Sequence, residues 1–309
     1  MKLAPVILFT FNRPEHTKKT LEALAANDLV NQTDLYIFSD GARGVNDFEN
    51  VKRVRDYLKE FEKFNNFSSV HIFESELNKG LAKSVINGVS QVFLEYDRVI
   101  VLEDDLLTSQ DFLKFMNLSL DKYDLNNNVG CITGYNPLRE MPKDYDFDNY
   151  FSIRTNSLGW GTWKRVWDNV DWKAEAYHKF KLNYKQRIIF NSAGFDRAKR
   201  LDRQMRKDAK SWSIIFGFDN FIKNKYTAYA KDSKIIHIGW DGTGTHSFVH
   251  SDKNIDKFND QIRVSLYPLN LANEVKINNE LLKLQQNLFG ASLILKVKDM
   301  VIFLKNFVS

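Results

Sequence analysis

Three consecutive carboxylates, Glu103-Asp104-Asp105, directly follow the apolar segment 98–102 (RVIVL). Adjacent negative charges repel one another, and burying them without partners is costly. A divalent cation removes that cost, and carboxylate and water ligands suit Mg²⁺ or Mn²⁺. Such an ion also binds diphosphate oxygens and neutralises charge on a departing phosphate. The alternative interpretation is a solvated acidic turn that caps the next helix.

The segments around this acidic run alternate between strand and helix patterns. Strand formers occupy residues 6–10, 34–39, 69–74 and 98–102, and helical periodicity is found at 15–25, 48–64, 81–93 and 109–123. This order predicts an α/β fold with a Rossmann-like, mainly parallel sheet flanked by helices on both faces. Ligands of such sheets bind at the carboxyl ends of the strands.

Polar residues follow three of these strands. Thr10-Phe11-Asn12-Arg13 ends the first, Ser39-Asp40-Gly41 ends the second, and the acidic run ends the fourth. Because the carboxyl ends of parallel strands share one edge of a sheet, we expect the three loops to converge. Each loop alone is also an ordinary turn or helix start, with Pro14 at a favoured first position. At successive strand ends, they favour a binding site.

Composition sets the broad class of the protein. The 309 residues are 43% hydrophobic and 27% charged, which predicts a packed globular core. The net charge of +5 fits anionic partners such as nucleotide diphosphates, lipid phosphates or a membrane surface, but no Lys/Arg run is dense enough to indicate nucleic acid. The single Cys131 excludes an intramolecular disulfide. With neither a signal peptide nor a bilayer-spanning segment recognised, we expect a cytoplasmic protein.

Several longer segments resemble a known family. PVILFTFNRPEHTKKTLEAL, FSDG, ELNKGLAKSVINGV and VIVLEDDLLTSQDFL, in this order, resemble the nucleotide-sugar half of a GT-A glycosyltransferase. The chain is similar to the family-2-like bacterial sugar transferases and to the N-acetylglucosaminyltransferase I group, which carries EDD where most GT-A enzymes carry DXD. SLGWGTWKRVW and HIGWDGTGTH resemble later segments of the same bacterial group. The resemblance covers residues 4–250 and is specific for fold and reaction type, not for the sugar.

The resemblance implies a division of the chain. Residues 1–130 would form the nucleotide-sugar-binding half and residues 131–275 the acceptor-binding half of one GT-A domain. Residues 276–309 would form a C-terminal amphipathic helix. Beyond residue 130 the strand–helix alternation stops, residues 175–225 look mostly helical and basic, and residues 235–238 form a short strand.

The resemblance also implies roles for single residues. Asp105 would ligate Mn²⁺ or Mg²⁺, Glu103 would hydrogen-bond the donor sugar, and Asp104 would lie near the ribose and sugar. Asp40 would accept a hydrogen bond from the base. The base, ribose and diphosphate would be contacted by Thr10, Asn12, Arg13, Asn78, Lys79 and Gly80.

Tryptophans in the second half could cover the apolar face of a sugar ring. We expect Trp160 and Gly161 to form a wall at the donor–acceptor boundary, with glycine allowing close approach of the ligand. Trp163 and Trp167 are spaced by four, which is typical of one apolar helix face. The glycine-rich turn 242–246 resembles a loop that closes over the diphosphate. His246 at its end would contact phosphate or metal, or be an ordinary surface histidine.

The catalytic base is the least defined residue. An inverting transfer needs a carboxylate to take the proton of the acceptor hydroxyl. Related sequences carry an Asp two residues before a Trp, but here Lys210 precedes Trp212. Asp208 is the preferred candidate, and the alternatives are Asp202, Asp219 and Asp241. The departure also leaves open a retaining mechanism or a catalytically weak protein.

The C-terminal segment 280–309 combines an apolar face with lysines. Such a helix can lie in an anionic membrane interface, which would place the protein peripherally on the inner face of the membrane. The alternative is a terminal helix packed on the body of the protein or on another subunit.

The sequence thus predicts a metal-dependent glycosyltransferase, a hexosyl- or N-acetylhexosaminyltransferase. It would move a sugar, with a UDP-sugar favoured as donor, to a hydroxyl of a glycan or lipid-linked glycan in bacterial surface polysaccharide synthesis, with inversion. A nucleotidyltransferase would need a glycine-rich phosphate loop after the first strand, and TFNRPEHT lacks the glycines. The alternative from another class, motivated by Lys210, is a non-catalytic nucleotide- or glycan-binding protein on the same scaffold.

Overall fold

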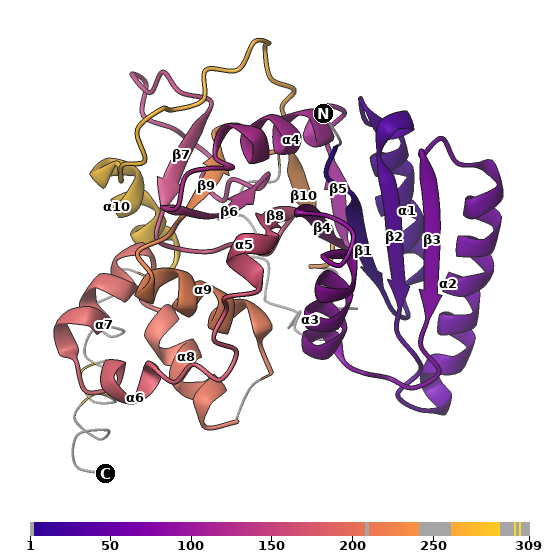
Figure 1. Ribbon diagram of the computed structural model, residues 1–309, viewed down its shortest axis with the longest axis horizontal. Coiled ribbons are helices and arrows are strands. Elements are labelled where there is room, and N and C mark those ends of the chain that lie inside the picture. The colour runs from indigo at the N-terminus through magenta and orange to yellow at the C-terminus, as the bar shows by residue number, and fades with distance from the viewer. Residues whose placement is uncertain (1–2, 208–209, 241–260, 291–299, 301–302, 304–309) are drawn as a thin grey trace.

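The computed structural model describes residues 3–207, 210–240, 261–290, 300 and 303. Within them, one eight-stranded sheet has the order β3-β2-β1-β4-β8-β6-β9-β7 (Figure 1). β10 pairs with β5 in a separate two-stranded ribbon. The strands are β1 (Val6–Thr10), β2 (Asp34–Ser39), β3 (Ser69–Glu74), β4 (Arg98–Glu103), β5 (Leu106–Thr108), β6 (Val129–Thr133), β7 (Asn149–Ser152), β8 (Trp160–Trp163), β9 (Tyr226–Ala230) and β10 (Ile235–His237).

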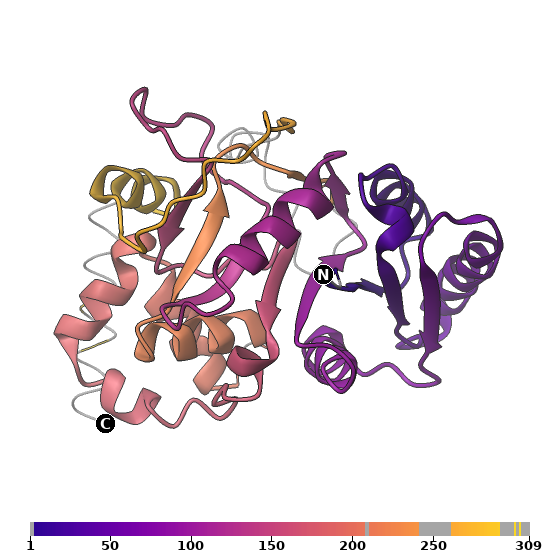
Figure 2. The same cartoon turned by 45° about the horizontal axis from the view of Figure 1, so that its top comes forward.

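The first half of the chain is a parallel β-α-β array. β1 pairs in parallel with β2 and β4, and β2 with β3. The crossover helices are α1 (Pro14–Ala25), α2 (Val45–Phe64) and α3 (Leu81–Val92). α1 and α2 connect β1 to β2 and β2 to β3, outward along the sheet, whereas α3 connects β3 back past β1 to β4. Because such connections are right-handed, α3 lies on the opposite face of the sheet from α1 and α2 (Figure 2). The predicted α/β fold, with a mainly parallel sheet flanked by helices, is confirmed.

The boundaries differ from the sequence prediction at one informative place. A helix was expected from residue 109, but α4 covers Phe112–Lys122, and residues 106–108 form β5 instead. β5 pairs antiparallel with β10, with Leu106 opposite His237. This long-range pairing brings β10 next to the acidic run. A local sequence pattern does not reveal such a pairing.

Trp160 and Gly161 lie inside the sheet and not at a cleft, so that expectation was wrong. They belong to β8, which runs antiparallel between β4 and β6. Trp160 is 1% exposed, and its ring lies 4.9 Å from that of Trp212 and 5.8 Å from that of Trp167. A Cβ on Gly161 would lie 2.9 Å from the carbonyl oxygen of Val99. The close approach that this glycine allows is to the neighbouring strand.

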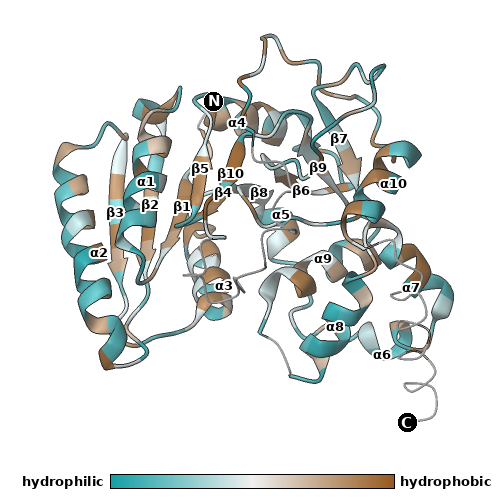
Figure 3. Cartoon of the chain, turned by 180° about the vertical axis from the view of Figure 1, so that it is seen from behind, coloured by the Kyte–Doolittle hydropathy of each residue, from teal (hydrophilic) through white to brown (hydrophobic). Residues whose placement is uncertain are grey.

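A second, mostly helical layer covers the other end of the sheet. It contains α5 (Lys164–Trp167), α6 (Tyr177–Phe180), α7 (Tyr184–Phe190), α8 (Arg197–Met205) and α9 (Trp212–Ile222), which agrees with the helical, basic segment predicted at 175–225. Trp163 and Trp167 are both buried, but the first ends β8 and the second lies on the one-turn α5. Figure 3 shows the apolar strands between helices whose outer faces, as on α2 and α8, are hydrophilic.

The C-terminal segment begins with α10 (Asn279–Leu288), which packs on the body of the protein. Leu281 is buried beside Tyr150 and Tyr229, and the amide of Gln285 donates to the Tyr150 hydroxyl over 3.2 Å. For α10, the packed alternative therefore holds. Most of 291–309 lies outside the described residues, so the predicted membrane surface there stays a prediction. No helix among the described residues is long and apolar enough to cross a membrane.

A fully buried ion pair joins α7 to α8. Arg187 and Asp202 are both 0% exposed, and their side chains bond in a bidentate manner over 3.0 and 2.9 Å, with the Tyr177 hydroxyl also donating to Asp202. This pairing holds Asp202 in the core, so it is excluded as the catalytic base.

We expect Asp202→Ala to destabilise the protein by about 3–5 kcal/mol, because it leaves the Arg187 guanidinium buried without its partner. Chemical denaturation followed by circular dichroism measures this. Asp168→Ala, which breaks an exposed pair with Lys164 at 2.9 Å, is the matched control. Its expected effect is below about 1 kcal/mol, and equal losses in the two variants would contradict the assigned difference.

Candidate functional site

A single cleft of about 980 Å³ opens at the carboxyl ends of β1, β2 and β4. It gathers the acidic run and the polar loops that the sequence placed at one sheet edge. The predicted residues that line it are Thr10, Asn12, Arg13, Asp40, Asn78, Lys79, Gly80, Glu103, Asp104 and Asp105. The convergence of these loops is thus found in the structure, whereas the ligand contacts assigned to each residue stay predictions.

Arg13 lines the cleft and pairs with two of the three carboxylates. Its guanidinium bonds to Asp104 and lies 2.8 Å from Oδ2 of Asp105. Burial opposes the charge on Arg13, but Asp104 and Asp105 outweigh it and raise the pKa of the guanidinium. Arg13 also caps α1, with Pro14 at the first turn, so the helix-start interpretation and the site interpretation both apply. A cation of the chain itself therefore neutralises part of the acidic run.

The three carboxyls of the acidic run have different ionisation. Burial, followed by the charges of Asp105 and Asp104, raises the pKa of Glu103 to about 8. Burial also raises the pKa of Asp104, although Arg13 opposes it. For Asp105 burial is outweighed by His237 and Arg13, which lower the pKa to about 2. Asp105 is therefore the carboxylate that stays ionised most readily, as expected of a metal ligand.

His237 is a site residue that the sequence did not single out. Its Nε2 lies 3.3 Å from Oδ2 of Asp105, and its ring packs edge-on against Trp240 at 4.7 Å. Gly239 makes this possible, because a Cβ there would collide with the Asp105 carboxylate. The segment HIGW was noted only for its resemblance, and nothing local in it indicates that β10 pairs with β5 beside the acidic run.

The side chains around Asp105 would suit a divalent cation that takes most of its coordination from a bound substrate. Oδ2 of Asp104 and Nδ1 of His237 are, among the described residues, buried polar atoms without a hydrogen-bond partner. Asp105 and His237 supply one carboxylate and one imidazole, with Nε2 of His237 3.3 Å from Oδ2 of Asp105. No group of three or more His, Cys, Asp or Glu side chains in the described part of the chain is arranged to hold a metal ion. Substrate phosphates and water would complete such a site, as they do for Mg²⁺.

Asp40 organises the loop before α3. One carboxylate oxygen accepts from the amides of Gly41 (3.0 Å) and Lys79 (2.8 Å), and the other accepts from the amide of Gly80 (2.9 Å). The Asn78 amide donates to the Gly41 carbonyl over 2.7 Å. Asp40 thus joins the end of β2 to the start of α3. Its expected contact with a base stays a prediction.

A second polar network borders the same end of the cleft. Asp47 on α2 accepts from the Asn12 amide over 2.6 Å and from Nε of Arg43 over 3.0 Å. The Arg43 guanidinium lies 4.8 Å from the centroid of the Phe11 ring. Phe11 and Arg43 both line the cleft, and they present an aromatic face and a cation to it. A planar, hydrogen-bonding ligand fits such a surface.

Trp172 and Trp212 form an aromatic wall of the cleft, which Gln204 and Lys210 also line. Both tryptophans pack against Trp167, and the Trp212 ring lies 4.9 Å from that of Trp160. Trp240 also lines the cleft, but it packs against His237 beside the acidic run.

Two predicted residues, Asp208 and His246, lie outside the described residues, as does the alternative base Asp241. Asp219 is 7% exposed and does not line the cleft, because Lys223 pairs with it at 2.7 Å and the amide of Asp171 donates to it. Among the described acidic residues named as alternative bases, neither Asp202 nor Asp219 faces the cleft.

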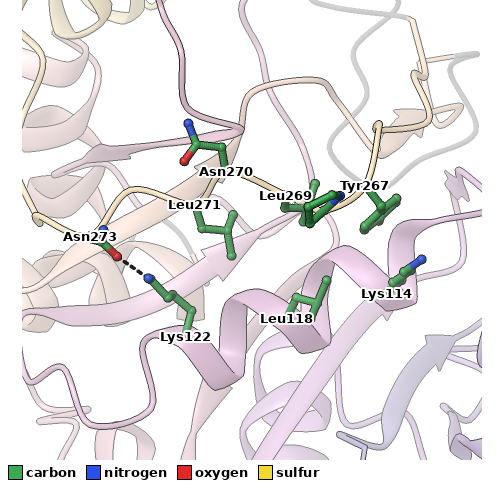
Figure 4. Close-up of a pocket in the computed structure, with 9 residues that line it drawn as sticks. Lys114, Leu118, Lys122, Tyr267, Leu269, Asn270, Leu271 and Asn273 are labelled. Atoms are coloured by element: carbon green, nitrogen blue, oxygen red, sulfur yellow. Dashed lines mark hydrogen bonds between the residues drawn. The ribbon is translucent and has the colours of Figure 1, made fainter.

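A second, shallower pocket of about 770 Å³ lies on the outer face of α4 (Figure 4). Lys114 and Lys122 point into it on either side of Leu118, and Lys114 Nζ lies 3.7 Å from the Tyr267 ring centroid. The lining residues that the structure describes include no carboxylate, so this pocket lacks the chemistry of the main cleft.

Comparison with known proteins gives limited likeness. Neither a protein-family model nor a curated protein matches the chain. Among solved structures it is similar to S. aureus TarS, with a TM-score of 0.47 and 12% identity over 76% of this chain. Two structures of S. aureus TarS 1-349, the second in complex with UDP-GlcNAc, give TM-scores of 0.44 and 0.43 at 12% and 10% identity over 76% and 75% of this chain.

The aligned part of this chain covers 36%, 60% and 57% of those three chains, which is less than two thirds of each. Because all three TM-scores lie below 0.5, we infer function below from the cleft and its residues.

We expect Arg13→Gln to lower the free energy of unfolding by about 3 kcal/mol, because Asp104 and Asp105 lose the cation that neutralises them. Thermal unfolding with and without MnCl₂ measures this, and added Mn²⁺ should raise the melting temperature of the variant more than that of the wild type. Arg53→Gln, which breaks an exposed pair with Glu15 at 3.1 Å, serves as control. Unchanged stability of Arg13→Gln would show that the acidic run needs no neutralising cation.

Proposed function

We propose that this chain is a metal-dependent glycosyltransferase on a GT-A scaffold, which transfers a sugar from a nucleotide diphosphate to a glycan hydroxyl. One observation supports it above the others. One cleft joins the acidic run at the carboxyl ends of parallel strands to a wall formed by Trp172 and Trp212. The first feature suits a diphosphate and the second suits sugar rings.

The nucleoside end would lie at the loops after β1 and β2. Phe11 offers a ring face for the base, with Arg43 above it, and Asn12 and Asp47 fix the position of Arg43. Lys79 and Lys83 from the start of α3 line the same side of the cleft and would attract phosphate oxygens. A uridine nucleotide is our favoured donor, and the base-reading contact assigned to Asp40 is part of this proposal.

Asp105 and His237 would hold Mn²⁺ or Mg²⁺ together with diphosphate oxygens. When bound, the ion supplies charge neutralisation for the leaving nucleoside diphosphate. Arg13 pairs with Asp104 and Asp105 and would keep both carboxylates in position. Glu103, whose pKa is raised to about 8 by burial and by its acidic neighbours, would form a hydrogen bond with the donor sugar.

The tryptophan wall would hold the acceptor with its hydroxyl facing the anomeric carbon. The bond from the acceptor oxygen to that carbon forms while the bond to the diphosphate oxygen breaks, which inverts the configuration. A carboxylate takes the hydroxyl proton, and Asp208 is our candidate because Asp202 and Asp219 are engaged elsewhere. We place the reaction in bacterial surface polysaccharide synthesis on the cytoplasmic side, with a lipid-linked glycan as one acceptor form.

A non-catalytic nucleotide- or glycan-binding protein is the second candidate. Lys210 lines the cleft where an acidic residue is expected from the resemblance, and it is exposed. A lysine ammonium group has only donors and no lone pair, so it does not act as the carboxylate base of an inverting transfer. Such a protein would bind nucleotide diphosphates but release none from a sugar donor.

The test is a release assay. The protein is incubated with Mn²⁺, an extract of bacterial glycans and a panel of nucleotide sugars that includes UDP-GlcNAc, and liberated nucleoside diphosphate is measured. Asp105→Asn should reduce kcat at least about 100-fold, a magnitude usual for loss of a charge-stabilising group. Asp56→Asn on the exposed face of α2 should leave the rate unchanged. Tight nucleotide binding without release from any donor would favour the binding protein.

A further inference from the structure

A cluster of exposed cations lies on α8 and the turn after it. We call it the α8 basic surface: Lys199, Arg200, Arg203, Lys207 and Lys210, all of which are exposed. α8 lies in the second half of the molecule, away from β2 and β3 (Figure 1), and its outer face is hydrophilic (Figure 3). The surface is formed by a short stretch of sequence, so it does not depend on how distant loops are placed.

The acidic side chains nearest to this surface, among those that the structure describes, pair mainly with other residues. Asp202 is fully buried and pairs with Arg187, and Asp196 pairs with Arg154 at 2.7 Å. In the part of the chain that the structure describes, Asp196 also lies 3.5 Å from Arg200, but no ion pair involves Lys199, Arg203 or Lys207. Cations that have no ion-pair partner among the described residues, here Lys199, Arg203 and Lys207, repel one another, and an anionic ligand would relieve that repulsion.

The α8 basic surface adjoins the tryptophan end of the cleft. Gln204 on α8 and Lys210 after it both line the cleft beside Trp212. Arg200 precedes Gln204 by four residues, so the two side chains lie on the same side of the helix. The nucleoside end, at Asn12 and Asp40, follows β1 and β2, which are two and three positions from β8 in the sheet order, whereas α9 with Trp212 packs over β8. The cations therefore flank the end that the donor nucleotide does not occupy.

We propose that the acceptor is an anionic glycan, whose repeating phosphodiester or carboxylate groups bind along the α8 basic surface while one hydroxyl enters the tryptophan end of the cleft. This rests on the proposed function, because it names the acceptor class of the same site. Arginine and lysine both pair with phosphate and carboxylate oxygens, and arginine does so in a bidentate manner. A neutral glycan gains nothing from these charges, whereas a polyanion is attracted from a distance and held in one direction along the helix.

The proposal is tested with a variant that removes three charges, Lys199→Gln/Arg203→Gln/Lys207→Gln. The control, Lys19→Gln/Lys52→Gln/Lys63→Gln, removes the same net charge from exposed positions on α1 and α2. Phosphorylated dextran, oligogalacturonate and unmodified dextran serve as probes, and binding is measured by fluorescence anisotropy at low and at physiological salt. Thermal unfolding and UDP binding show that each variant is folded.

We expect the wild type to bind both anionic probes and not unmodified dextran, with affinity that falls as salt rises. The α8 variant should bind them at least about fivefold more weakly, and the control within about twofold of the wild type. With transfer assayed, the KM for an anionic acceptor should rise in the α8 variant while the KM for the donor stays the same.

Equally weakened binding of the anionic probes in both variants would overturn the proposal, because the loss would then depend only on the net charge of the protein. Equal binding of unmodified dextran would overturn it as well, and so would a stronger loss of binding to single-stranded RNA or anionic vesicles than to the anionic glycans. The outcome is separable from the proposed function. If the α8 variant loses binding to the anionic probes but no donor releases its nucleotide, the result supports the α8 basic surface and contradicts sugar transfer. If nucleotide is released but the α8 variant binds the anionic probes as the wild type does, the result contradicts the α8 basic surface alone.

Discussion

The pairing of Arg13 with Asp104 and Asp105 is the interaction on which the cleft depends. β1 and β4 are parallel neighbours, with Phe9 opposite Glu103, so the residues after each strand emerge side by side. One strand end carries the cation and the other carries the acids. Without that match the acidic run would have to stay in solvent or become protonated, and the sheet edge could not close around it.

The rest of the site is arranged around this ion cluster. Thr20 on α1 donates to the backbone carbonyl of Asp104 over 2.9 Å, so the first crossover helix is fixed to the acidic run. The amide of Ile238 donates to the carbonyl of Asp105 over 2.9 Å, so the segment after β10 is fixed to it as well. Asp40 does the same for α3 with three backbone amides. Short hydrogen bonds to backbone atoms thus fix the loops around the cleft relative to one another.

What the sequence could predict follows from how local each feature is. The runs of strand formers and the period-3.6 patterns of the first half predict β1 to β4 and α1 to α3, and strand direction then decides where Asn12, Asp40 and Asp105 lie. His237 was missed because its position depends on the pairing of β5 with β10, which are far apart in sequence. Trp160 was misplaced because no local pattern shows that β8 inserts antiparallel between β4 and β6. The tryptophans that line the cleft, Trp172, Trp212 and Trp240, lie outside the strands.

The insertion of β8 also sets the distance between the two parts of the cleft. β1, which carries the nucleoside end, and β8, which carries the core beneath the tryptophan wall, are separated in the sheet by β4 alone. Strands in a sheet lie about 4.8 Å apart, so these two supports are held about 10 Å apart by backbone hydrogen bonds. That separation is fixed in steps of whole strands and does not change with small shifts of loops. A related chain could therefore acquire a larger substrate by trimming side chains of the wall, but not by stretching the sheet that carries it.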